Sequence, residues 1–132
     1  MPLIHIKSLP MPEGTDIKET LLELCRELAK DLTVDTKDVL VTWEYFQPHH
    51  YATRGTTEKE QPRNEFPILI DILAPDFHGR SRIERMFKVI TNILTMHAKI
   101  PRDNVFINCR LAHSGMVFDE GSIKDWDEQG GS

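Results

Sequence analysis

The sequence predicts an α+β fold: a four-stranded mixed sheet with two helices on one face, in the order β-α-β-β-α-β. Three observations support this: two amphipathic helical stripes, four apolar strand-like segments, and a repeat of both at an offset of 66 residues. Each half is predicted to be strand, helix, strand, and a helix that joins two parallel strands makes a right-handed crossover. The chain, residues 1–132, is therefore expected to form a single domain.

The first half is predicted to contain two strands and one helix. Residues 3–9 alternate partly between apolar and polar side chains, and a run with two prolines and a glycine ends this strand. Thr15 or Asp16 can cap the following helix. Residues 39–46 are rich in β-branched and aromatic side chains, which favour a strand. The apolar stripe of the helix recurs every three or four positions: Ile17, Leu21, Leu24, Cys25, Leu28 and Leu32.

The second half begins after a long polar connection, residues 47–65, which has room for a small hairpin. Residues 66–73 are almost continuously apolar and predict a central strand. Residues 105–111 predict the last strand, and residues 124–132, which are acidic and end in Gly-Gly-Ser, are expected to be a flexible tail. The second helix has its own apolar stripe: Ile83, Met86, Phe87, Ile90, Leu94 and Ala98.

The two halves are related without any gap. Shifting the chain by 66 residues places Ile17 on Ile83 and Gly55 on Gly121, so the repeats cover about 2–55 and 66–121. Two helices on one side leave the other sheet face bare. We expect that face to carry leucine, isoleucine, valine and aromatic side chains, and to pack against neighbouring chains in a closed ring.

Composition excludes several classes of function. Sixteen basic and twenty-one acidic side chains give a net charge of −5, which disfavours nucleic acid as a partner. No apolar run approaches the roughly 20 residues that span a bilayer, and no signal peptide is evident. Two cysteines, Cys25 and Cys109, form neither a disulfide framework nor a zinc quartet. We expect a cytoplasmic protein with no membrane partner.

The first two residues of the sequence, Met1-Pro2, could provide a reactive amine. Removal of an initiator methionine before proline would leave a secondary amine. An α-amino group titrates at about 7.7–8.0 in the open, and burial in an apolar pocket lowers its pKa. Such an amine is a workable general base near neutral pH and could also add to a carbonyl. The alternative is that Pro2 merely begins a strand, where proline is tolerated.

The Met-Pro start, the two β-α-β halves and the chain length resemble the tautomerase superfamily, which includes 4-oxalocrotonate tautomerase and macrophage migration inhibitory factor. Residues 18–21 resemble the first helix of the former, and residues 101–108 the last strand of the latter. Residues 66–80 and 117–121 resemble a poorly characterised bacterial branch. The resemblance implies an isomerase without a cofactor: a homotrimer with sites between subunits, where Pro2 moves a proton during keto–enol conversion.

The same resemblance implies further site residues. Phe106 and Asn108 match an aromatic and an asparagine that the last strand lends to the neighbouring subunit's pocket, although Phe106 lacks a hydroxyl group. Tyr51 lies near an aromatic position that walls the pocket of 4-oxalocrotonate tautomerase. These residues, with a keto or unsaturated acid as ligand, are expectations from the resemblance.

The cations that hold acidic substrates in the family are absent at their usual places. Those places carry Pro12 or Glu13, Leu40 and, near the second strand, Val34. Arg80 at the start of the second helix, Arg110, and Arg54 in the long connection are candidate replacements, and each could equally be a solvated surface arginine. The resulting hypothesis is tautomerisation of a small keto or unsaturated acid, with Pro2 as base and Arg80 and Asn108 holding its oxygens.

Two other functions stay open. The chain could be a binding or assembly protein that keeps the fold without turnover, which the missing cations favour. It could also be a dehalogenase or hydratase that acts on unsaturated acids, in which Glu44 or Asp71 activates water. A metal site is not expected, because His49 and His50 have no evident third ligand.

Overall fold

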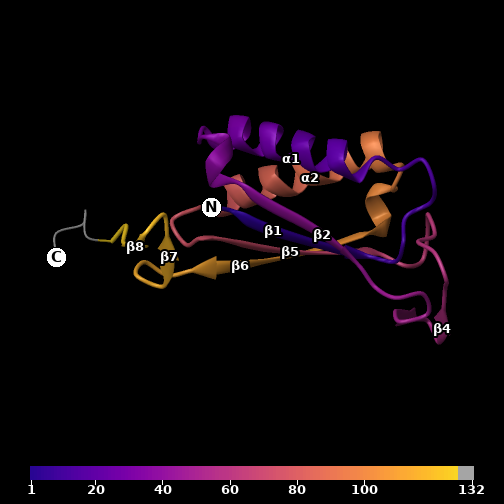
Figure 1. Ribbon diagram of the computed structural model, residues 1–132. Coiled ribbons are helices and arrows are strands. Elements are labelled where there is room, and N and C mark those ends of the chain that lie inside the picture. The colour runs from indigo at the N-terminus through magenta and orange to yellow at the C-terminus, as the bar shows by residue number, and fades with distance from the viewer. Residues whose placement is uncertain (128–132) are drawn as a thin grey trace.

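The computed structural model describes residues 1–127, and its main sheet has the strand order β2-β1-β5-β6 (Figure 1). Strands β1 and β2 pair in parallel, as do β5 and β6, whereas the central pair β1–β5 is antiparallel. This arrangement confirms the predicted four-stranded mixed sheet. The strands are β1 (Leu3–Ser8), β2 (Leu40–Tyr45), β5 (Ile68–Pro75) and β6 (Val105–Ala112).

Both helices lie on the same face of the sheet (Figure 1). Helix α1 (Ile17–Leu32) has the predicted bounds, and Asp16 caps it by accepting a hydrogen bond from the Glu19 amide at 2.9 Å. Helix α2 (Arg80–Ala98) begins three residues before its apolar stripe, after Gly79. Alternate residues of β1 and β5 point toward the helices and are buried there, so the core is a single layer between sheet and helices.

The repeat extends into the short elements. The 3₁₀ helices η1 (Thr36–Asp38) and η2 (Arg102–Asn104) differ by 66 residues. One small hairpin follows the last main-sheet strand of each half: β3 (Ala52–Thr53) with β4 (Thr56–Thr57) in the first half, and β7 (Val117–Asp119) with β8 (Ser122–Lys124) in the second. They lie at opposite ends of the sheet (Figure 1).

Both hairpin turns use the same backbone conformation. Arg54-Gly55 have φ values of 54° and 75°, and Glu120-Gly121 have values of 52° and 82°. Two successive residues with positive φ are typical of the tight turn that matches the twist of a hairpin, and glycine at the second position relieves the strain. The match of Gly55 with Gly121 therefore marks a duplicated hairpin, although the sequence predicted no strands after residue 111.

The helix-free face of the sheet is more polar than we expected. The isoleucines of β1 and β5 alternate toward the helices, which leaves leucines and polar residues on the other side. His5 bonds to Thr42, and Arg110 pairs with Asp71 across two strands. The face carries Leu3, Leu40, Leu69, Leu73, Phe106, His5, Lys7, Thr42, Glu44, Asp71, Asn108 and Arg110.

The segment expected to be a tail, residues 124–132, begins inside β8. The Trp126 and Asp127 amides both donate to the Ser114 hydroxyl, at 2.7 and 3.0 Å. Residues 124–127 are thus bonded to the fold, and the rest of the expected tail lies outside the described residues.

Candidate functional site

A cavity of about 250 Å³ lies at the beginning of β1, between the end of η1 and the β7–β8 hairpin. We call it the Met1 cavity. Its apolar wall consists of Met1, Val34, Pro75, Phe77, Val117 and Trp126. Its charged residues are Asp38, Asp119, Glu120 and Lys124.

Pro2 follows Met1, a lining residue of this cavity. Pro2 is buried, and its carbonyl accepts a hydrogen bond from the Leu40 amide at 3.0 Å, which holds the start of β1 against β2. Met1 itself lines the cavity. With Met1 attached, the Pro2 nitrogen is an amide with no basic lone pair. Cleavage of the Met1–Pro2 bond would leave a proline amine next to the space that Met1 now occupies at the cavity.

The C-terminal hairpin forms one side of the cavity and is fastened by Asp76. The Trp126 indole donates to one Asp76 oxygen at 2.8 Å, and His113 lies 2.9 Å from the other. These two partners, Trp126 first, hold the pKa of the Asp76 carboxyl below its usual value. Trp126 also packs edge-on against Phe77, with ring centroids 5.7 Å apart. The hairpin is therefore a fixed part of the cavity wall at neutral pH.

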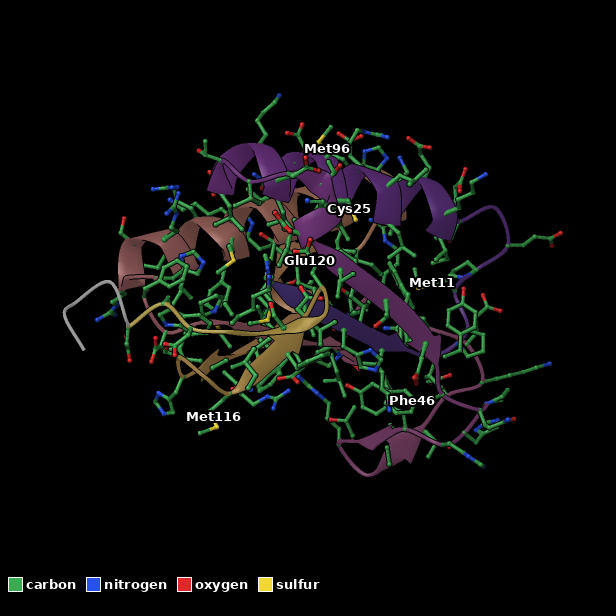
Figure 2. All side chains as sticks on the ribbon, turned by 60° about the vertical axis from the view of Figure 1, so that its left-hand side comes forward. Met11, Cys25, Phe46, Met96, Met116 and Glu120 are labelled. Carbon is green, nitrogen blue, oxygen red and sulfur yellow. The ribbon has the colours of Figure 1, made fainter. Side chains whose placement is uncertain are left out.

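Three carboxylates line the Met1 cavity, together with Lys124 and with Met1, which carries the N-terminal ammonium group. Glu120 lies 3.6 Å from Lys37 and 3.8 Å from Lys124, so both lysines pair with one carboxylate. Figure 2 shows Glu120 at the hairpin tip. Asp38 and Asp119 are half-buried and have no ion-pair partner among residues 1–127.

The arginines that were predicted to bind substrate lie outside the Met1 cavity. Arg80 lines a separate cavity of about 530 Å³, beside the start of α2, and its Nε lies 3.2 Å from Glu84. On the helix-free face, the Arg110 guanidinium donates two hydrogen bonds to the Asp71 carboxylate, at 3.2 and 2.5 Å. The Arg110 guanidinium, aided by Asn108, lowers the pKa of the Asp71 carboxyl. Within one chain, neither arginine reaches the Met1 cavity.

The remaining nominated residues are also outside this cavity. Phe106 is 59% exposed and Asn108 donates to Asp71 at 3.1 Å, both on the helix-free face of the edge strand β6. Tyr51 packs between Phe46 and Phe66 and donates its hydroxyl proton to the Pro67 carbonyl at 2.8 Å. Burial raises the pKa of Tyr51. None of the predicted site residues lines the Met1 cavity, and Pro2 adjoins it through its bond to Met1.

The sequence analysis missed the hairpin residues of this site. Asp119, Glu120, Lys124 and Trp126 follow the last predicted strand. The repeat of Gly55 at Gly121 was the available signal for the hairpin itself. The anchor could not be anticipated, because Trp126 and Asp76 are fifty residues apart in the chain.

A second cavity, of about 290 Å³, occupies the equivalent place in the other half, and we call it the Pro67 cavity. The offset of 66 relates Met1 to Pro67, Asp38 to Asn104 and Arg54 to Glu120, and each of these residues lines its own cavity. The Pro67 cavity also contains Thr53, Asn64, Glu65 and Asp103.

Among residues 1–127, no three histidine, cysteine, aspartate or glutamate side chains gather as a metal site would require. No helix in the described part of the chain has both the length and the apolar character needed to cross a membrane.

Comparison of the sequence with models of protein families and with curated proteins finds no match. Comparison of the structure finds many. Pt0534, solved after inactivation by 2-oxo-3-pentynoate, superposes with a TM-score of 0.78 over 98% of this chain and 99% of its own, at 12% identity. A symmetric trimer of fused 4-OT gives 0.75 over 92% and 94%, at 6% identity.

A macrophage migration inhibitory factor homologue from Prochlorococcus marinus gives a TM-score of 0.69 over 92% of this chain and 98% of its own, at 21% identity. All three neighbours match nearly the whole chain, and identities this low establish the fold. The β-α-β-β-α-β chain described above therefore has the fold of the tautomerase superfamily.

Proposed function

We propose that this chain, after removal of Met1, catalyses keto–enol tautomerisation of a small carbonyl compound with the Pro2 amine as general base. One observation carries the proposal: Met1 lines a half-apolar cavity, and the bond that joins it to the buried Pro2 lies at that cavity. Loss of Met1 both frees the amine and enlarges the space beside it.

The proton transfers balance without a cofactor. The Pro2 nitrogen takes a proton from the carbon next to the carbonyl, and the electron pair of the C–H bond moves into a carbon–carbon double bond while the carbonyl oxygen gains charge. The same ammonium group then gives its proton to that oxygen. A neutral amine is required for the first step, so its pKa should lie near the working pH.

The structural neighbours support this proposal at the level of fold. They include fused 4-OT and a migration inhibitory factor homologue, and the Pt0534 structure is named for its inactivation by a reactive keto acid. We further propose a homotrimer, by analogy with the symmetric trimer of fused 4-OT. In that assembly, Phe106 and Asn108 on the edge strand β6 would serve a neighbouring subunit.

A second candidate is a binding protein without turnover. The observation in its favour is that Arg80 and Arg110 each pair with a carboxylate and lie outside the Met1 cavity. The acids named for the dehalogenase or hydratase alternative, Glu44 and Asp71, lie outside the Met1 cavity, in ion pairs on the helix-free face.

The deciding experiment measures ketonisation of the enols of phenylpyruvate and its methyl ester by the processed protein and by Pro2→Ala. Mass spectrometry first verifies that Met1 is absent from both. We expect Pro2→Ala, which offers a primary amine of different basicity and shape, to lose about 10²-fold in kcat/KM. A processed protein no faster than buffer with either compound would favour the binding protein, and equal rates for both proteins would exclude Pro2 as the base.

A further inference from the structure

The charges of the Met1 cavity bear on which carbonyl compounds can enter it. After removal of Met1, and with the Pro2 amine neutral, Asp38, Asp119 and Glu120 face one lining cation among the described residues, Lys124, which already pairs with Glu120. A carboxylate bound there would sit among like charges that are partly shielded from water. Such repulsion is stronger than at an open surface.

Asp38 is the carboxylate placed to act most directly. It ends η1, two residues before Leu40, whose amide donates to the Pro2 carbonyl at 3.0 Å. Its side chain is half-buried, and no cation neutralises it within the described residues. The equivalent residue of the other half is Asn104, which has a similar shape and no charge.

The rest of the lining suits an apolar body. Val34, Phe77, Val117 and Trp126 present aliphatic and aromatic surface. The cavity volume of about 250 Å³ fits a small molecule rather than a polymer. Apolar contacts of this kind favour a ligand with an aromatic or branched group.

We infer that the Met1 cavity prefers neutral carbonyl compounds with an apolar body, such as esters or ketones, to free keto acids, and that Asp38 sets this preference. The inference rests on the proposed function and names the substrate class of that same site. Asp38 is a specificity-determining residue here, because it repels a carboxylate on the substrate and leaves the proton transfer itself to Pro2.

The test compares the enols of a keto acid and of its uncharged methyl ester, phenylpyruvate and methyl phenylpyruvate. For each we measure kcat/KM with the processed protein and divide it by the rate of spontaneous ketonisation. We expect the ester to be favoured about tenfold, and Asp38→Asn to raise the value for the acid about fivefold while the ester changes less than twofold. The ratio of acid to ester is the readout because any effect on Pro2 basicity acts on both compounds alike.

Glu60→Gln is the matched control. Glu60 is exposed in the long connection and lines neither the Met1 cavity nor the Pro67 cavity, and its substitution changes the net charge by the same amount. Circular dichroism verifies that both variants fold. We expect the control to leave the acid-to-ester ratio unchanged, and added salt to raise that ratio in the unsubstituted protein.

The outcomes separate the two proposals. If the acid is the better substrate of the processed protein, or if Asp38→Asn leaves the ratio where Glu60→Gln leaves it, the charge preference is overturned while turnover by Pro2 stands. If neither compound is turned over, the proposed function fails, and the preference falls with it.

Discussion

The Met1 and Pro67 cavities occupy equivalent positions in two repeats of one unit, yet only the first lies where processing of the chain can create a proline amine. Met1 corresponds to Pro67 at an offset of 66. Pro67 continues into β5 from Phe66, so every backbone nitrogen there is an amide. Processing before Pro2 can create an amine only in the Met1 cavity.

The two cavities also differ in the side chains that line them. Asp38 and Glu120 of the Met1 cavity are replaced by Asn104 and Arg54 in the Pro67 cavity. The hairpins keep the same turn conformation, with φ values of 52° and 54° at Glu120 and Arg54. The two hairpin turns therefore share one backbone conformation, while the side chains that line the two cavities differ.

The largest effect should come from blocking the Pro2 nitrogen. A chain that keeps extra residues in front of Met1 cannot form the amine, and we expect its ketonisation rate to equal that of buffer. Asn64→Ala, in the Pro67 cavity, should retain activity within about twofold, because that cavity has no N-terminal proline amine. A similar loss in both proteins would contradict the division of labour between the two cavities.

Equivalent substitutions in the core of the two halves should lower the free energy of unfolding by similar amounts. Leu28 and Leu94 are equivalent by the repeat, and both are fully buried between sheet and helices. Truncation of either to alanine should lower the free energy of unfolding by about 2–5 kcal/mol in denaturant titrations. A loss inside this range for one variant and outside it for the other would show that the halves contribute unequally to the stability of the fold.

The hairpin of the Met1 cavity should depend on its anchor. Trp126→Phe keeps an aromatic ring against Phe77 but removes the indole donor to Asp76. We expect a smaller loss of global stability than in either leucine variant, together with faster amide exchange in β7 and β8. Exchange in β3 and β4 is the internal control, and equal acceleration there would point to general loosening.

Acid should release the same anchor. Because the folded state lowers the pKa of Asp76 below its ordinary 3.8, its carboxylate stabilises the docked hairpin at neutral pH, and this contribution disappears as the pH falls through the lowered value. Fluorescence of Trp126 in a Trp43→Phe background should report a transition there. Asp76→Asn should remove it, and its persistence in that variant would assign it to another group.

Much of the fold was predictable because periodicity and repeats are local signals. Helix α1 was predicted with its bounds, since the stripe from Ile17 to Leu32 and the cap at Asp16 agree. The composition of the helix-free face was not, because a shift of one residue exchanges the two faces of a strand. Ile70 and Asp71 are neighbours in the chain and lie on opposite sides of the sheet.

The candidate site was predictable only in part. Met1-Pro2 identifies the nitrogen, but the cavity around it needs contacts between distant residues. The contacts of Trp126 with Asp76 and of Lys37 with Glu120 join residues that are far apart in the sequence, so they exist only in the folded chain. Tyr51 was expected near a pocket, and its place between two phenylalanines depends on how the long connection folds.

One measurement tests the central claim most directly. Processed protein and protein that retains Met1 are mixed in known proportions, verified by mass spectrometry, and the ketonisation rate of methyl phenylpyruvate is recorded for each mixture. We predict a rate that increases with the fraction of chains that begin at Pro2 and that falls to the rate of buffer when this fraction is zero. A rate independent of that fraction would contradict catalysis by the Pro2 amine.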